Sequence, residues 1–221
     1  MLQATAEAGP YDGPVASPRY GPGTALIVVD VQNDFADPYG SLYVRGGEDI
    51  CATINAEISA AIAAGSPVIY TKDWHPPVTP HFQIDGGIWP VHCVQGSWGA
   101  EFHRGLDVVP DAPIVHKGSG GEDGYSAFSV RDPVSGDVQR TQLGEMLEER
   151  EVTSIVIAGL ATDYCVKETG LDAIELGFDP TVLVDAVRAV DLEPGDGARA
   201  LDALAKAGVA LARAGAGLIE S

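Results

Sequence analysis

Cysteine is scarce in this chain of 221 residues, which contains only three. Cys51, Cys93 and Cys165 lie far apart, and neither their number nor their spacing fits a disulfide framework or a C-x-x-C zinc motif. A reducing compartment, and hence a cytoplasmic location, is therefore expected. No long apolar run follows a basic N-terminal segment, and the C-terminal Ala/Gly-rich stretch is interrupted by Arg213, so neither an export signal nor a membrane span is predicted.

Basic side chains are also few, because 13 lysine and arginine residues stand against 32 aspartate and glutamate residues. The resulting formal charge of −19 opposes binding to nucleic acid or to anionic membrane surfaces, so we expect neither partner. With 45% hydrophobic residues, the chain can bury the core of one large domain.

Residues 1–23 lack apolar periodicity and contain four of the fifteen prolines. This composition predicts an irregular N-terminal arm, followed by a single domain over residues 24–221. Because such an arm can lie across a neighbouring subunit, we consider a homo-oligomer as the assembly.

Apolar runs that alternate with amphipathic segments indicate the fold class. Strands are expected at residues 24–30, 67–73, 113–117, 153–158, 181–185 and 209–211. Helices are expected at residues 50–62, where isoleucine recurs every four positions, and at 143–150, 165–177 and 201–208. This alternation predicts the α/β class, with a three-layer α/β/α fold around a mostly parallel, doubly wound sheet.

Four chemically reactive side chains come at the carboxyl ends of predicted strands. Asp30 and Asp73 end the first two strands, Lys117 ends the third, and Cys165 lies in the turn after the fourth. Ligands of doubly wound sheets bind outside these strand ends, so we expect the four side chains to share one site. The long irregular stretch from residue 74 to about 112 adds to this prediction, because a loop of that length is usually functional.

A nucleophile site is the first hypothesis for this edge of the sheet. Cys165 is expected in the first turn of a helix, where the helix dipole and unpaired N–H groups favour a thiolate and can bind an oxyanion. Asp30 would accept the thiol proton, and the Lys117 ammonium would stabilise the thiolate. The alternatives are that Cys165 is a small buried apolar residue, that Asp30 only caps a turn, and that Lys117 is a solvated strand end.

A metal site is the second hypothesis. Three of the five histidines, His75, His81 and His92, fall within the twenty residues that begin with Asp73. A mixed imidazole and carboxylate set suits one divalent zinc, iron or manganese ion in a catalytic setting. The alternative is a loop with scattered surface histidines. The remaining two, His103 and His116, are interpreted as structural or solvated.

Aromatic residues accompany the reactive ones and can form the wall of a pocket for a flat ring: Phe35, Trp89, Tyr125 and Tyr164. Ordinary packing is the alternative for each of them. The glycine-rich run 117–124 lacks the Walker lysine and the dinucleotide spacing, so phosphate binding is not predicted there.

The combination of these residues resembles the isochorismatase-like cysteine hydrolases, and within them the nicotinamidase/pyrazinamidase branch. The resemblance extends over about residues 24–190 and is carried by Asp30-Val-Gln-Asn-Asp-Phe35, Thr71-Lys-Asp-Trp-His75, His81-Phe, Trp89-Pro-Val-His-Cys-Val94, Phe102-His103, His116-Lys-Gly118, Tyr125-Ser-Ala-Phe128 and Gly159-Leu-Ala-Thr-Asp-Tyr-Cys-Val166.

The resemblance implies a role for each of the residues singled out above. It implies a catalytic triad of Asp30, Lys117 and Cys165. It implies that one metal ion is held by Asp73, His75, His81 and His92. It further implies a cis peptide bond between Leu160 and Ala161, which would orient the N–H groups of Ala161 and Cys165 as an oxyanion hole.

The resemblance also implies a substrate, a small aromatic amide. The implied reaction is hydrolysis of nicotinamide, and of pyrazinamide, to the acid and ammonia through a cysteine thioester, with a role in NAD salvage. Tyr164 is a departure, because family members often carry histidine there. The alternative within the same fold is a metal-independent amidohydrolase acting on a carbamoyl or ureido compound.

Overall fold

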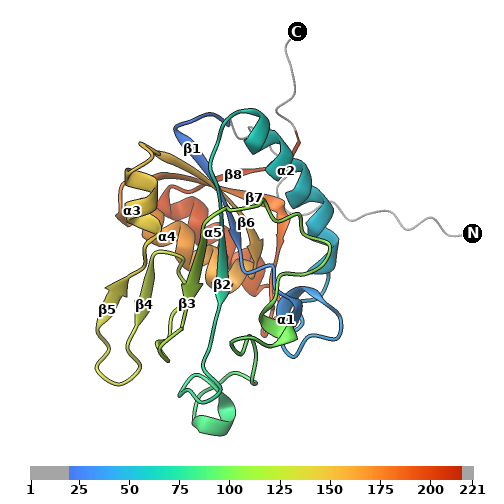
Figure 1. Cartoon of the computed structure of the whole chain (residues 1–221), viewed down its shortest axis with the longest axis vertical. Coiled ribbons are helices and arrows are strands. Elements are labelled where there is room, and N and C mark those ends of the chain that lie inside the picture. Colours follow the sequence, from blue (N-terminus) through green and yellow to red (C-terminus); the bar gives the residue numbers. More distant parts are fainter. Residues whose placement is uncertain (1–19, 216–221) are drawn as a thin grey trace, which may run out of the picture.

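A six-stranded parallel sheet forms the centre of the computed structural model, which describes residues 20–215 (Figure 1). In spatial order the strands are β3 (Ile114–Lys117), β2 (Val68–Asp73), β1 (Thr24–Val29), β6 (Ser154–Leu160), β7 (Asp179–Arg188) and β8 (Ala210–Ala212). Each strand pairs in parallel with its neighbours. The predicted fold class is therefore confirmed.

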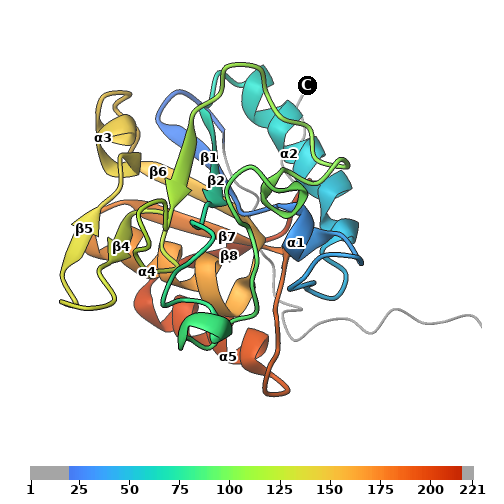
Figure 2. The same cartoon turned by 60° about the horizontal axis from the view of Figure 1, so that its bottom comes forward.

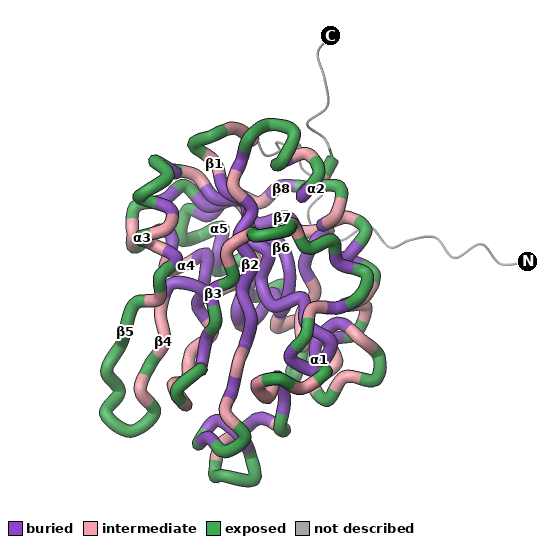
Figure 3. Tube along the Cα trace, in the orientation of Figure 1, coloured by how far each residue is buried: buried purple, intermediate pink, exposed green. Residues whose placement is uncertain are grey.

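Helices cover both faces of the sheet and make the outer layers. One face is covered by α2 (Cys51–Ala63), and the other by α3 (Leu143–Glu148), α4 (Lys167–Glu175) and α5 (Asp196–Ala207). Strand β1 serves both layers, because Leu26 and Val28 pack on the α2 side while Ala25 and Ile27 pack on the opposite side. Figure 3 shows the resulting buried centre along the strands.

Helix α2 buries only part of the isoleucine pattern that predicts it. Ile50, Ile54 and Ile58 are buried, whereas Ile62 is 53% exposed. The reason is geometric: a spacing of four residues exceeds the 3.6 residues of one helical turn, so the fourth isoleucine has rotated away from the sheet.

Several short elements were not predicted. They are α1 (Asn33–Ala36), the 3₁₀ turns Glu48–Ile50, Gln83–Asp85 and Trp98–Ala100, and an antiparallel hairpin of β4 (Ser129–Arg131) and β5 (Val138–Arg140). The hairpin has no buried face, since β5 is exposed along its length, so it leaves no alternating apolar pattern in the sequence.

The strand order reverses between β1 and β6. From β1 the chain adds β2 and β3 on one side, and from β6 it adds β7 and β8 on the other. The carboxyl ends of β1 and β6 thus border the position where ligands bind in doubly wound sheets. Figure 2 brings this edge forward, together with the long loop that follows β2.

The predicted arm at residues 1–23 falls mostly outside the described residues, which start at Tyr20. Within residues 20–215, no helix has the length and apolar character needed to cross a membrane.

A buried carboxylate joins the two ends of the described chain to α2. Glu57 is 3% exposed and accepts hydrogen bonds from the Tyr20 hydroxyl at 2.7 Å and from the Gly215 N–H at 2.8 Å. Burial and the neighbouring carboxylate raise the pKa of Tyr20, so its hydroxyl stays a donor. Glu57 thus holds both ends of the described chain, Tyr20 and Gly215, against α2.

Replacement of this carboxylate is expected to destabilise the fold. Glu57→Ala removes the acceptor of two hydrogen bonds, one from the partly buried Tyr20 and one from the exposed Gly215, and we expect a loss of about 1 to 2 kcal/mol in the free energy of unfolding, measured by urea denaturation. Glu148→Ala, at an exposed glutamate of α3, is the control and should stay close to the parent chain. Equal stability of the two variants would contradict the role of Glu57.

Candidate active site

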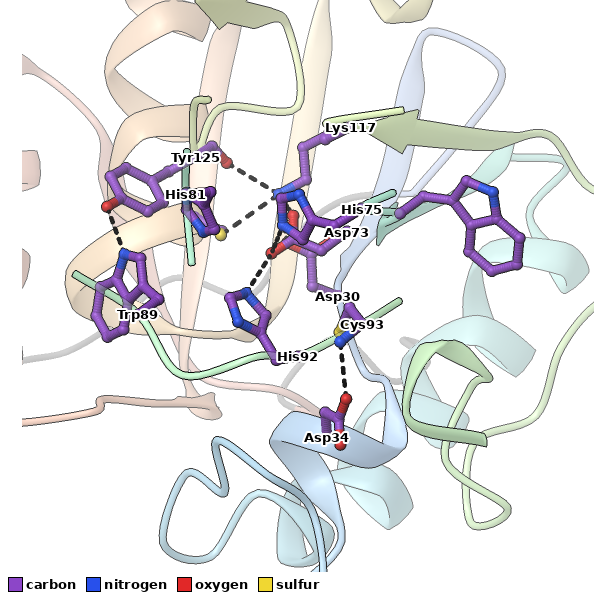
Figure 4. A network of polar contacts seen from close by, with 12 residues as sticks. Asp30, Asp34, Asp73, His75, His81, Trp89, His92, Cys93, Lys117 and Tyr125 are labelled. Atoms are coloured by element: carbon purple, nitrogen blue, oxygen red, sulfur yellow. Dashed lines mark hydrogen bonds and ion pairs between the residues drawn. The ribbon is translucent and has the colours of Figure 1, made fainter. Parts of the chain in front are cut away.

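Lys117 lies at the centre of a group of buried reactive side chains. Its Nζ is 2.6 Å from Asp30 Oδ2, 2.7 Å from Asp73 Oδ1 and 3.4 Å from Cys165 Sγ. Asp30 follows β1, Asp73 and Lys117 end β2 and β3, and Cys165 lies after β6. The structure therefore brings together four side chains from four strand ends, and Figure 4 shows Lys117 and the two aspartates among them.

The burial and the hydrogen bonds of Asp30 and Lys117 do not fit the alternatives of a turn cap and a solvated strand end. The Lys117 side chain is 1% exposed, so it is not a solvated strand end. Asp30 is fully buried at a backbone φ of 48°, and its carboxylate accepts from Lys117 and from the Thr71 hydroxyl at 2.5 Å. A carboxylate held by two buried donors does more than cap a turn.

Charge at this centre is governed by burial and by the short contacts. Burial alone lowers the pKa of Lys117, but the carboxylates of Asp30 and Asp73 outweigh it and raise that pKa well above its usual range. Burial raises the pKa of Asp30, although Lys117 opposes this. Burial also opposes ionisation of Asp73, yet Lys117 and two histidines hold its pKa well below the usual value. The ammonium is thus retained at neutral pH.

The location of the Cys165 thiol and the direction of its pKa shift both differ from what the sequence predicts. It lies in a π-helical turn, Thr162–Val166, that precedes α4, and not in the first turn of an α-helix. Burial raises the pKa of the Cys165 thiol well above its usual value, despite the nearby Lys117. The sulfur and an Asp30 carboxylate oxygen lie within 4.8 Å of each other. The stable group is therefore a thiol with a carboxylate base beside it.

The peptide bond between Leu160 and Ala161 is cis. Ala161 follows β6 directly and lines the same pocket as Cys165. The turn that carries the thiol thus begins directly after a residue that lines the pocket.

Three histidines lie beside the Lys117 centre and could hold a metal ion. One ring nitrogen from each of His75, His81 and His92 lies within 4.8 Å of the others, and all three residues are buried. Asp73 Oδ2 is 3.8 Å from Nε2 of both His75 and His92. These histidines are a buried cluster rather than a scatter on a loop surface.

His75 provides the test of whether this cluster fits a metal ion. Both of its ring nitrogens are buried and have no hydrogen-bond partner among the described residues. Burial lowers the pKa of His75, which favours the neutral imidazole that metal ions bind. A Cβ on Gly118 would come within 2.6 Å of His75 Nδ1, so the glycine leaves room for this ring. An unpaired, neutral imidazole among three donor groups fits a divalent ion.

Two residues near the start of α1 hold the backbone around the histidine cluster in place. Gln32 donates to the carbonyls of Asp73 and Ala100 and accepts from the Asp73 N–H. Asp34 accepts from the Cys93 N–H at 2.7 Å, next to His92. The sequence carries no signal for these roles of Gln32, Asp34 and Thr71, because their bonds reach partners 41 or more residues away.

An aromatic wall encloses the pocket in front of Cys165. Phe35, Trp89, Tyr125 and Tyr164 all line it. Trp89 Nε1 donates to the Tyr125 hydroxyl at 3.0 Å, and the Tyr164 ring meets both rings at centroid distances of 5.0 and 5.2 Å. Phe35 packs against the ring of His92.

Apolar residues that no motif singled out complete the pocket: Leu42, Val44, Leu160 and Val190. Val190 is fixed to the turn that carries Cys165, because its N–H and that of Asp191 donate to the buried carboxylate of Asp163. The pocket thus combines an apolar interior with polar groups at one end, as expected for a small flat ligand.

The two remaining histidines lie outside the cluster. His103 is buried, with Nδ1 3.4 Å from Cys51 Sγ and Nε2 3.7 Å from Asp37 Oδ2. His116 is exposed and its ring lies 5.0 Å from that of Trp74. These positions agree with a structural and a solvated interpretation.

Known proteins are similar to this chain in sequence and in architecture. A model of the Isochorismatase domain matches residues 24–215. The chain is 39% identical over 207 residues to the nicotinamidase of Escherichia coli (strain K12), covering 86% of this chain and 94% of that protein.

Solved structures are similar over nearly their whole length. A crystal structure of pyrazinamidase of Pyrococcus horikoshii in complex with zinc is 38% identical, with a TM-score of 0.77 and coverage of 86% of this chain and 99% of that chain. PnC1 from L. infantum, in complex with nicotinate, is 34% identical, with a TM-score of 0.79 and coverage of 90% and 96%. The family match extends over nearly the whole described chain, and the chain therefore belongs to the isochorismatase family.

Proposed function

We propose that this protein hydrolyses nicotinamide to nicotinate and ammonia through a thioester on Cys165, with a divalent metal ion in the site. The observation that carries the proposal is Lys117, whose ammonium contacts Asp30, Asp73 and Cys165 beside the three-histidine cluster. Relatives named nicotinamidase, and similar structures with zinc and with nicotinate, support the same activity. Pyrazinamide is a second substrate, and the reaction is a step of NAD salvage.

A metal ion would be held by Asp73, His75, His81 and His92, the residues whose donor atoms cluster beside Lys117. When bound, it would supply Lewis-acid chemistry to the substrate. Zinc, iron and manganese all suit this donor set.

The apolar pocket holds the substrate ring between Phe35 and Trp89, with Tyr125 and Tyr164 closing the wall. Such a position leaves the amide group toward Cys165, which lines the same pocket. The apolar walls exclude water from the sulfur, and this strengthens the electrostatic effect of Lys117 on the reacting atoms.

In the first half-reaction, Asp30 accepts the proton of the Cys165 thiol, and the sulfur forms a bond to the amide carbon. The N–H groups of Ala161 and Cys165 stabilise the oxyanion that develops. Asp30 then returns the proton to the amide nitrogen as the C–N bond breaks. Ammonia leaves, and the acyl group stays on the sulfur as a thioester.

In the second half-reaction, Asp30 takes a proton from a water molecule that attacks the thioester carbon. Cleavage of the C–S bond gives nicotinic acid, the proton on Asp30 returns to the sulfur, and the product loses its carboxylic acid proton to become nicotinate. Lys117 remains positively charged throughout, because the two carboxylates raise its pKa, and it stabilises the negative charge that passes between Asp30 and Cys165.

The alternative, a metal-independent hydrolase of carbamoyl or ureido compounds, does not require the histidine cluster. The unpaired buried nitrogens of His75 favour the metal-dependent reaction over it. The single domain at residues 24–221, the homo-oligomer and the cytoplasmic location stay predictions.

Substitution of the nucleophile is expected to abolish turnover. Cys165→Ala removes the sulfur, so ammonia release from nicotinamide should fall by at least about 1,000-fold while nicotinate binding, measured by calorimetry, is kept. Cys51→Ala, which removes a buried thiol elsewhere, should keep turnover. Activity in Cys165→Ala would refute the thioester route.

Loss of one histidine is expected to empty the metal site. His75→Ala should purify with less than about a tenth of the metal per chain found in the parent protein, determined by plasma mass spectrometry. The exposed His116→Ala is the matched control and should retain the metal. Unchanged metal content in His75→Ala would show that the ligand set is wrong.

The pH profile should report the hydrogen bond between Thr71 and Asp30. This bond stabilises the carboxylate and lowers the pKa of Asp30, so Thr71→Val raises that pKa. Because Asp30 must be ionised to accept the thiol proton, the acid limb of kcat/KM should move to higher pH. Thr169→Val removes a buried hydroxyl bonded to the Ala127 N–H and should leave the limb in place. An unmoved limb in Thr71→Val would exclude Asp30 as the base in this profile.

A further inference from the structure

His81 is a member of the histidine cluster that lies outside the sheet. It belongs, like His92, to the long loop after β2, whereas His75 follows the end of β2 by two residues. Its Nδ1 is 2.7 Å from Asp123 Oδ1, a carboxylate 42 residues further along the chain. The side chain of His81 is 5% exposed and that of Asp123 is 43% exposed. The contact therefore joins the inside of the site to the surface of the protein.

The backbone at Asp123 is well anchored. Its N–H donates to the Arg131 carbonyl at 2.7 Å, and its carbonyl accepts from the Arg131 N–H at 2.5 Å. Arg131 belongs to β4, so the exposed hairpin fixes the position of this carboxylate. The preceding glycines permit the required path, because Gly118 and Gly121 adopt φ values of 74° and 94°. The glycine-rich segment 118–124 thus delivers one acid to the edge of the metal site.

The other two histidines of the cluster are oriented differently. His92 Nδ1 bonds to the Pro90 carbonyl at 2.7 Å, within the same loop. His75 has no hydrogen-bond partner on either nitrogen among the described residues, although its Nε2 lies 3.8 Å from Asp73 Oδ2. Of the three, His81 alone has its Nδ1 bonded to a carboxylate.

We propose that Asp123 is a positioning residue for the metal ion, acting through His81. The inference rests on the proposed metal-dependent function. The carboxylate accepts the Nδ1 proton of His81, which fixes the tautomer with the proton on Nδ1 and leaves the lone pair of Nε2 for the ion. It also orients the His81 ring through the ring's hydrogen bond to Asp123. Carboxylates that hold metal-binding histidines in this way raise the basicity of the ligand.

A stabilising role of the ion pair is the alternative explanation. Partly exposed ion pairs contribute little to stability, so the main effect of Asp123 is expected on metal affinity and not on folding. These two effects can be measured separately.

The neighbouring acid provides a matched control. Asp123→Asn and Glu122→Gln each remove one negative charge from the same segment, but the Glu122 carboxylate bonds to the Gly120 N–H and not to a histidine. Zinc affinity of the full chain is measured by competition with a chromophoric chelator. Asp123→Asn should bind zinc about 10- to 100-fold more weakly than the parent protein. The zinc affinity of Glu122→Gln should stay within about twofold of that of the parent protein, since a partly exposed carboxylate that is not bonded to a histidine is screened by salt.

Two further measurements separate positioning from folding. The melting temperature of the metal-free protein should be unchanged in Asp123→Asn, and the visible spectrum of the cobalt-substituted protein should change only in that variant. Equal zinc affinity in the three proteins would overturn the inference and leave the metal site standing. A loss of affinity matched by a lower metal-free melting temperature, or an equal loss in Glu122→Gln, would also overturn it. If the parent protein binds no zinc, cobalt, iron or manganese, both the metal site and this inference fail.

Discussion

The buried ammonium of Lys117 is the constraint on which the rest of the site depends. A charge removed from water is tolerated only when other charges and hydrogen bonds replace the water, and here two carboxylates within 2.7 Å do so. Asp30 and Asp73 come from different strands, so the ammonium also fixes the distance between the proposed base and the proposed metal ligand. Two acids shared by one ammonium leave an excess of negative charge, which a divalent ion at the proposed histidine site would offset.

The sheet supplies this arrangement through its topology. Parallel strands end at the same edge, and the reversal of order between β1 and β6 opens a position where Asp30 and Cys165 can approach each other. Lys117 reaches them from β3 across β2, and β2 itself contributes Asp73. The acid and amine therefore stand on rigid backbone, and the thiol lies in the turn that leaves β6.

The aromatic wall of the pocket and the histidines do not lie at the strand ends that carry Asp30, Asp73 and Lys117. Trp89 and Tyr125 of the pocket wall come from loops, as do His81 and His92, and the loops are held by buried polar side chains such as Gln32 and Asp34. Asp123, which pairs with Arg131 of β4, reaches His81 from outside the central sheet. A fold of this kind can keep one reaction while its loops change the ligand that enters the pocket.

The sequence by itself determined the parallel sheet, because buried central strands are continuous apolar runs and each was visible as such. It also determined which reactive residues stand at the strand ends, including Asp30, Lys117 and Cys165. Only the tertiary structure decided the direction of the pKa shift of Cys165, since burial is a property of the packed molecule and it outweighs the nearby ammonium of Lys117. The exposed hairpin and the pairing of His81 with Asp123 were equally beyond the sequence, because they depend on the solvent-facing side of an element or on contacts between distant segments.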